Sequence, residues 1–251
     1  MRPLLDLDPD EQRRRFASAR LLATDVDGTL TQAAKLSPAI VQAIAALCAA
    51  GVEVMPVSGR PAGELQGLVR YLPGVRRAIA ENGLLEIVPD HPPRWLAAKS
   101  DRARLRTLAR ELSDALALDL QPTADDPFRL GDVAFEREAR SDAILAELGQ
   151  RARERGVHVT WSNVHVHFTE EPPDKGVGLL AAAECDPSAI ITIGDAPNDA
   201  GLFVAGRFGT TVGTADVLRH EAAMPALPEL VASAPEAAGF LELATLVLAH
   251  R

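Results

Sequence analysis

Two aspartates separated by one residue, Asp25 and Asp27, end an apolar run in the segment LLATDVDGTLT, and Gly28 then turns the chain. Because side chains alternate along a strand, both carboxylates point the same way while Val26 points into the core. At about 4 Å and an effective dielectric constant of about 20, like charges repel by roughly 4 kcal/mol. Proteins keep such pairs where a cation, a shared proton or both offset this repulsion. The spacing therefore favours a metal-binding or acid–base site.

Two other interpretations of this motif are open. Asp and Gly are common in turns, so the motif is also typical of a surface junction between a strand and a turn. A calcium-binding EF-hand loop fits badly, because Ala23 would occupy the position of the first ligand and Ala34 that of the closing glutamate.

Further polar residues follow predicted strands or begin predicted helices. They are Ser58-Gly59-Arg60, Lys175, and the pair Asp195 and Asp199. Each has a simpler explanation, since Lys175 could be a solvated surface charge and the two aspartates a turn residue and a helix N-cap. Together, however, they stand where a parallel sheet brings its functional residues to one edge.

The elements that must position these residues alternate between strand and helix. Strands are predicted from Leu21 to the two aspartates and at 52–57, 78–80, 189–193 and 210–212. Helices are predicted at 38–50, 61–71, 174–184 and 237–249. Residues 1–19 are expected to form a short polar helix or a loose tail. The alternation predicts an α/β fold with a parallel sheet and crossover helices.

The alternation breaks after Gly83. A hairpin or connector is expected over 84–95, a helix to about 118, a polar loop at 121–127, a strand at 129–136 and a charged helix at 140–155. The segment VHVTWSNVHVHF (157–168) predicts a hairpin. A two-residue turn at Ser162-Asn163 would place Trp161 opposite Val164 and Val157 opposite Phe168.

This hairpin would carry one apolar and one polar face. The apolar face should pack on the two preceding helices, and the polar face carries His158, Thr160, His165 and His167. We therefore expect residues 87–168 to form a small α+β domain inserted into a larger one built from residues 1–86 and 169–251.

Composition restricts the class of protein. A chain of 251 residues with 47% hydrophobic and 24% charged residues is typical of a globular protein. The net charge of −9 argues against a nucleic-acid partner. Without a signal peptide or an apolar run of about 18 residues, a cytoplasmic protein with no membrane partner is expected, as a monomer or homodimer. Cys48 and Cys185 are expected to be buried thiols rather than a disulfide.

The four motifs DVDGT, SGR, DKG and GDAPND resemble those of the haloacid dehalogenase-like hydrolase superfamily. The insertion between the second and third motifs, and the ENG at 81–83, resemble its type IIB cap subgroup of Cof-like sugar phosphatases. The resemblance covers nearly all of the chain after residue 20. It implies a Rossmann-like parallel sheet core whose inserted cap reads the substrate. It also implies a Mg²⁺-dependent phosphatase, a phosphoric monoester hydrolase, acting on a small phosphorylated metabolite such as a sugar or sugar-acid phosphate.

The resemblance assigns a role to each motif residue. Asp25 would be the nucleophile that becomes an aspartyl phosphate, and Asp27 the general acid and base. Ser58 and Gly59 would contact the phosphoryl group, and Lys175 would place a positive charge beside it. Asn198 could contact the phosphoryl group or hold the motif loop. Mg²⁺ would be bound by the carboxylates of Asp25 and Asp195 and the backbone carbonyl of Asp27, while Asp199 would bind the ion or orient its waters. Arg60 could contact substrate or form a salt bridge at a helix start.

Other interpretations of the function and of the cap remain open. A phosphosugar mutase of the same superfamily, or a non-catalytic metabolite-binding protein, could use the same scaffold. His158, His165 and His167 could contact substrate, line a solvated surface, or bind zinc, although no cysteine or clear fourth ligand lies near them.

Overall fold

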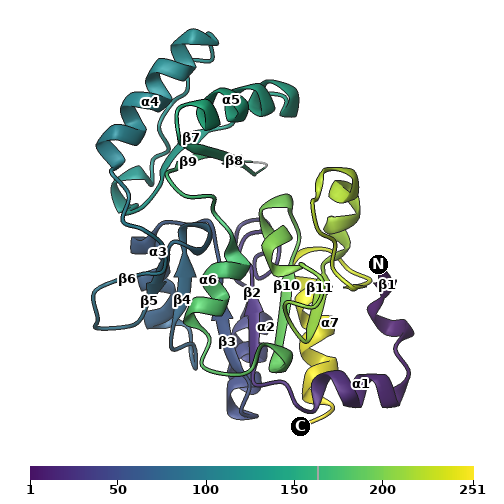
Figure 1. The fold of residues 1–251 in the computed structure, drawn as a ribbon. Coiled ribbons are helices and arrows are strands. Elements are labelled where there is room, and N and C mark those ends of the chain that lie inside the picture. Colours follow the sequence, from purple (N-terminus) through teal and green to yellow (C-terminus); the bar gives the residue numbers. More distant parts are fainter. Residues whose placement is uncertain (163) are drawn as a thin grey trace.

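Six parallel strands form the main sheet of the protein, in the order β1-β12-β11-β10-β2-β3 (Figure 1). We describe a computed structural model, which covers residues 1–162 and 164–251. The strands are β1 (Arg2–Pro3), β2 (Leu21–Thr24), β3 (Glu53–Pro56), β10 (Ile190–Gly194), β11 (Thr210–Gly213) and β12 (Leu230–Val231). The predicted α/β class with a parallel sheet is confirmed. Since β2 is hydrogen-bonded between β10 and β3, the residue that follows β2 lies in the middle of the sheet edge.

Both faces of the main sheet are covered, as is typical of parallel sheets. The helices of this part are α1 (Pro9–Phe16), α2 (Pro38–Ala49), α3 (Ala62–Tyr71), α6 (Lys175–Ala182) and α7 (Glu236–Leu248). Leu22 packs in one buried cluster with residues of α2 and α7, and its neighbours Leu21 and Ala23 pack in another with Leu179 of α6. None of the helices in the described ranges has the length and apolar character needed to cross a bilayer.

The N-terminal segment is ordered more extensively than a loose tail. The expected polar helix is α1, but β1 also pairs with β12 and extends the sheet. Leu4 and Phe16 are fully buried, and their burial fixes the segment on the core. Two-residue strands such as β1 and β12 carry too little periodicity to be recognised in a sequence.

A second, antiparallel sheet adjoins the edge strand β3. It contains β4 (Ala78–Ala80), β5 (Leu85–Ile87) and β6 (Arg94–Trp95), which confirms a hairpin in the 84–95 segment. The Ser58 N–H donates to the Ile79 carbonyl, so β4 extends the main sheet beyond β3. Leu85 and Ile87 pack with the main core, so this hairpin lies with the parallel sheet.

A third sheet, with strand order β7-β9-β8, stands apart from the main sheet (Figure 1). Its strands are β7 (Val133–Glu136), β8 (His158–Trp161) and β9 (His165–Thr169), and its helices are α4 (Arg102–Ala115) and α5 (Asp142–Glu154). Val159, Val166 and Phe168 pack against leucines of the two helices in a separate buried cluster. The predicted packing of the apolar hairpin face on two helices is confirmed.

The predicted register of this hairpin is wrong by two residues. Trp161 pairs with Val166 and Val159 with Phe168, whereas pairing of Trp161 with Val164 was expected. The Ser162 hydroxyl accepts the N–H groups of Val164 and His165, so the connection is longer than two residues. Asn163, the second residue of the expected turn, lies outside the described residues. A shift of two preserves the faces, which is why the face prediction holds although the register does not.

Candidate active site

The buried ammonium group of Lys175 joins two carboxylates at the centre of the sheet edge. Asp25 directly follows β2, and its N–H donates to the Ile193 carbonyl of β10 at 2.9 Å. Lys175, the first residue of α6, donates from Nζ to Asp25 Oδ1 at 2.6 Å and to Asp199 Oδ1 at 2.6 Å. Lys175 has no exposed surface. Burial alone would lower the pKa of Lys175, but Asp199 and Asp25 raise it overall, so the lysine carries its charge.

Three buried carboxylates exceed the charge that this lysine can balance. Oxygen atoms of Asp25, Asp195 and Asp199 all lie within 4.8 Å of one another, and no other described residues form such a group. Burial, together with the neighbouring carboxylates, raises the pKa of Asp25 to about 7 and that of Asp195 to about 9. An additional cation would relieve this excess. Hard carboxylate oxygens in this number are the donor set that suits Mg²⁺.

Asp199 shapes the loop that carries Asp195. Its Oδ2 accepts the N–H groups of Asp195 at 2.9 Å and Ala196 at 3.0 Å, while its Oδ1 accepts Lys175. Both oxygens are thus engaged by donors of the protein. Of the two roles left open for Asp199, this geometry favours orienting the site over direct binding of an ion.

Gly28 allows the turn after β2 to approach Asp195 closely. Its φ is +80°, and an added Cβ would lie 2.5 Å from Asp195 Oδ2. The next residue, Thr29, donates from its hydroxyl to Asp195 Oδ1 at 3.1 Å. Thr29 is a site residue that the sequence analysis missed, because a threonine in a turn has no distinctive pattern.

Asp27 lies on the open side of the site and is held by Arg60. Arg60 donates from Nε and Nη2 to the two Asp27 oxygens, each at 2.7 Å, and from Nη1 to Glu64 at 2.6 Å. The Asp27 side chain is 46% exposed, whereas that of Asp25 is buried. The two aspartates therefore occupy different environments. This suits two different roles, with the buried Asp25 as a nucleophile and the exposed Asp27 as an acid–base group.

The loop Ser58-Gly59-Arg60 lies beside the turn that follows β4. An added Cβ at Gly59 would lie 3.0 Å from the Asn82 side chain. The amide of Asn198 in turn donates to Asn82 Oδ1 at 3.3 Å. Asn82 thus connects the second and fourth motifs. The sequence singled out its ENG segment by resemblance, but not this contact with the two motifs.

The polar face of the third sheet is turned toward these loops. Thr160 lines a cleft of about 240 Å³ together with Asn82 and Asn198. His167 pairs with Thr160 across the strands and His158 with Thr169, so they share one face. The rings of His165 and His167 lie 6.0 Å apart.

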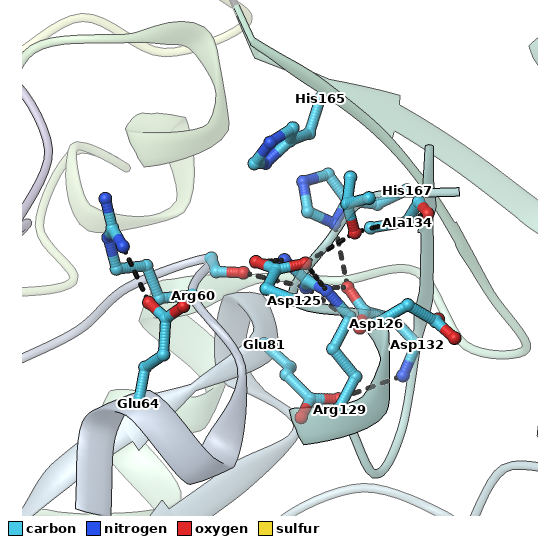
Figure 2. A network of polar contacts seen from close by, with 12 residues as sticks. Arg60, Glu64, Glu81, Asp125, Asp126, Arg129, Asp132, Ala134, His165 and His167 are labelled. Atoms are coloured by element: carbon cyan, nitrogen blue, oxygen red, sulfur yellow. Dashed lines mark hydrogen bonds and ion pairs between the residues drawn. The ribbon is translucent and has the colours of Figure 1, made fainter. Parts of the chain in front are cut away.

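The three histidines are not arranged as a metal site. His167 is buried and bonds through Nδ1 to Asp132 at 2.8 Å (Figure 2), and burial lowers the pKa of His165. In the part of the chain that the structure covers, the histidines form no cluster of three metal-ligating groups.

Comparison with known proteins agrees with this geometry. A family model described as haloacid dehalogenase-like hydrolase matches residues 22–92. A phosphoglycolate phosphatase of Natronomonas pharaonis is 31% identical over 228 residues, which cover 88% of this chain and 94% of that protein. A phosphoglycolate phosphatase of Methanospirillum hungatei is 27% identical over 237 residues, covering 92% of this chain and 97% of the relative.

Solved structures share the fold at lower sequence identity. A protein of Thermoplasma acidophilum has a TM-score of 0.75 at 19% identity, covering 91% of this chain and 98% of its own. The sucrose-phosphatase of Synechocystis, solved with sucrose and phosphate, has a TM-score of 0.66 at 17% identity and the same coverage. Both likenesses extend over nine tenths of this chain.

Proposed function

As a member of the haloacid dehalogenase-like hydrolases this chain is a phosphatase, and we propose that it is a Mg²⁺-dependent enzyme that transfers the phosphoryl group of a small phosphorylated metabolite to Asp25 and then to water. The observation that carries the proposal is the position of Lys175, in contact with Asp25 and Asp199 beside Asp195. An acidic pocket that already holds one cation is suited to receive a second cation together with a phosphate.

The chain's own residues account for the two half-reactions. Asp25, fixed at the end of β2, attacks the phosphorus and becomes an aspartyl phosphate. Asp27 protonates the leaving oxygen and later takes a proton from the attacking water, once substrate loosens its pairing with Arg60. Ser58, Gly59 and Asn198 contact the phosphoryl oxygens, and Lys175 balances their charge. Asp25 and Asp195 would hold Mg²⁺, which supplies positive charge beside the phosphoryl oxygens when it is bound.

We propose that residues 1–86 and 169–251 form the catalytic core and that residues 87–168 form a cap that reads the organic part of the substrate. The compact part of this cap begins near α4, because the β5–β6 hairpin packs with the core. The cap presents His158, Thr160 and His165 on the face turned toward the core loops. These groups can hydrogen-bond hydroxyl or carboxylate oxygens.

The names of relatives and this polar face support one class of substrate. Because relatives are named phosphoglycolate phosphatases, we propose a small phosphorylated hydroxy acid, with 2-phosphoglycolate as the first candidate. Sugar and sugar-acid phosphates share the phosphoryl group and the hydroxyl or carboxylate oxygens.

A panel assay tests the proposal. Release of inorganic phosphate is measured from 2-phosphoglycolate, phosphorylated sugars and nucleotides, in Mg²⁺ and in EDTA. We expect Mg²⁺-dependent release, fastest for the small acid, and without any bisphosphate activator. A requirement for a bisphosphate, with phosphate moved and not released, would identify a phosphosugar mutase and contradict the proposal.

A further inference from the structure

Two buried charged side chains connect the core to the cap beside the loop Ser58-Gly59-Arg60, which we call the phosphate loop. Glu81 belongs to the core turn that follows β4, and Arg129 belongs to the cap segment that precedes β7 (Figure 2). Glu81 has no exposed surface, and Arg129 is only 1% exposed. Neither residue contacts the acidic centre formed by Asp25, Asp195 and Asp199. The proposed chemistry therefore gives neither of them a role.

Glu81 binds backbone N–H groups from both domains. Its Oε1 accepts from Ala62, the first residue of α3, at 3.1 Å and from Leu130 at 2.9 Å. Its Oε2 accepts from Gly131 at 2.6 Å and from Asp132 at 3.0 Å. A carboxylate from the core thus satisfies three successive N–H groups of the cap. A buried carboxylate is costly unless it is hydrogen-bonded in this way.

The turn that carries Glu81 has an unusual backbone. Glu81 and Asn82 have φ values of +52° and +55°, and Gly83 has +106°. Residues other than glycine rarely adopt this conformation, because Cβ then crowds the following carbonyl oxygen. An added Cβ at Gly83 would lie 2.4 Å from the Asp174 carbonyl, so the turn is also pressed against the start of α6. The contacts on all sides hold the strained turn in place.

Arg129 makes the reciprocal connection from the cap. It donates from Nη1 to the carbonyl of Gly59 in the phosphate loop at 3.1 Å. It is also paired with Asp125 at 2.9 Å and with Asp132 at 3.0 Å. Asp132 in turn bonds to His167 on the polar face of the cap at 2.8 Å. One continuous set of polar contacts therefore runs from the phosphate loop to the face that would meet the substrate.

We propose that Glu81 and Arg129 are positioning residues that hold the cap's polar face at a fixed place over the loop Ser58-Gly59-Arg60. The inference rests on the proposed function, since it assigns the two residues a part in aligning the substrate between phosphate loop and cap. A misplacement of about 1 Å between groups that act together can cost about 10²-fold in rate. Loss of either connection should therefore lower kcat/KM while the acidic centre stays complete.

The test compares variants of the full chain. Arg129→Met removes the donors at similar length. Glu81→Gln replaces one acceptor oxygen by an NH₂ group that faces two N–H donors. Arg140→Met is the matched control, because Arg140 is 12% exposed and bonds to the carbonyls of Leu118 and Glu136 and to Glu138, all within the cap.

We expect kcat/KM for 2-phosphoglycolate to fall by about 10²-fold in R129M and E81Q and to stay within about twofold of wild type in R140M. Independently of activity, amide hydrogen exchange at Leu130, Gly131 and Asp132 should be faster in E81Q than in wild type and R140M. If R129M does not fold, Arg129→Lys keeps a charge near Asp125 and Asp132. Its single ammonium group replaces the three nitrogens that share the contacts with Asp125, Asp132 and the Gly59 carbonyl, and a loss of kcat/KM is again expected.

The outcomes separate this inference from the proposed function. A wild-type protein that releases no phosphate from any ester would contradict the proposed function, while the exchange rates would still report whether Glu81 holds the cap backbone. An active wild type, with R129M or R129K and E81Q matching R140M in both kcat/KM and exchange, would overturn the positioning role.

Discussion

The Lys175 ammonium lies 2.6 Å from the Asp25 carboxylate, although the two residues are 150 positions apart in the sequence. The parallel sheet explains this contact, because Asp25 directly follows the inner strand β2 and α6 begins beside it. The same sheet edge receives Asp195 from β10, the direct neighbour of β2. In a site assembled from strand ends, the rigid sheet holds the reactive side chains in place. The surrounding loops and the cap can then vary in sequence without disturbing those side chains.

Asp25→Asn tests the nucleophile. An amide cannot form the aspartyl phosphate, so turnover should fall by at least about 10³-fold. The fold should persist, because the amide carbonyl can still accept the Lys175 hydrogen bond. Phosphate release measures the turnover, and circular dichroism measures whether the fold persists. Asp90→Asn, in an exposed loop, is the control. Activity retained in D25N would mean that another group attacks phosphorus.

Gly28→Ala tests the close approach to Asp195, and Gly51→Ala provides a matched control. The two glycines have φ values of +80° and +82°, but only Gly28 has atoms within 4 Å of an added Cβ. Both substitutions should cost about 1–2 kcal/mol of stability through the left-handed conformation. Only G28A should also weaken Mg²⁺ binding, measured by calorimetry, because it displaces Asp195. Equal Mg²⁺ affinities in the two variants would speak against Asp195 as a ligand.

The pH dependence of stability should depend on Glu81. Burial, then the nearby Asp132, raises its pKa from 4.5 to about 7, although its backbone hydrogen bonds oppose this. A folded-state pKa above the unfolded value stabilises the protein below about pH 4.5, and this contribution is lost as the pH rises through about 7. The full effect is roughly 3 kcal/mol.

Urea unfolding of wild type and Glu81→Gln at pH 5 and pH 8 measures this contribution. Wild type should lose stability relative to E81Q as the pH rises, since glutamine does not titrate. A stability difference that is the same at both pH values would show that Glu81 has an ordinary pKa.

The cap histidines should affect substrate binding more than the chemical step. Replacing His158, His165 and His167 together by Gln should raise KM for the true substrate by about tenfold and change kcat little, because the acidic centre is untouched. Glutamine preserves an N–H donor for Asp132. His91→Gln, in an exposed loop, is the control. An unchanged KM would show that the three histidines do not contribute to substrate binding.

The sequence predicts the inner strands of the main sheet and the residues at their edge well. Each of these strands is a short apolar run that ends at a polar residue, namely Asp25, Ser58 or Asp195. It does not predict the hairpin register, which the contacts of Ser162 set. Nor does it predict the partners of Arg129 or Glu81, because no sequence pattern indicates which distant backbone group a charged side chain will contact. A salt bridge of Arg60 at a helix start is one of two open interpretations of the sequence, and only three-dimensional contacts identify its partners as Asp27 and Glu64.

Trapping the phosphorylated enzyme tests the central claim most directly. Wild-type protein with Mg²⁺ and substrate is quenched within one turnover, digested and mapped by mass spectrometry. We predict a phosphoryl group on Asp25, in the peptide that contains DVDGT, and none when EDTA replaces Mg²⁺. Turnover with the label on another residue, or with no covalent label at all, would contradict transfer through Asp25.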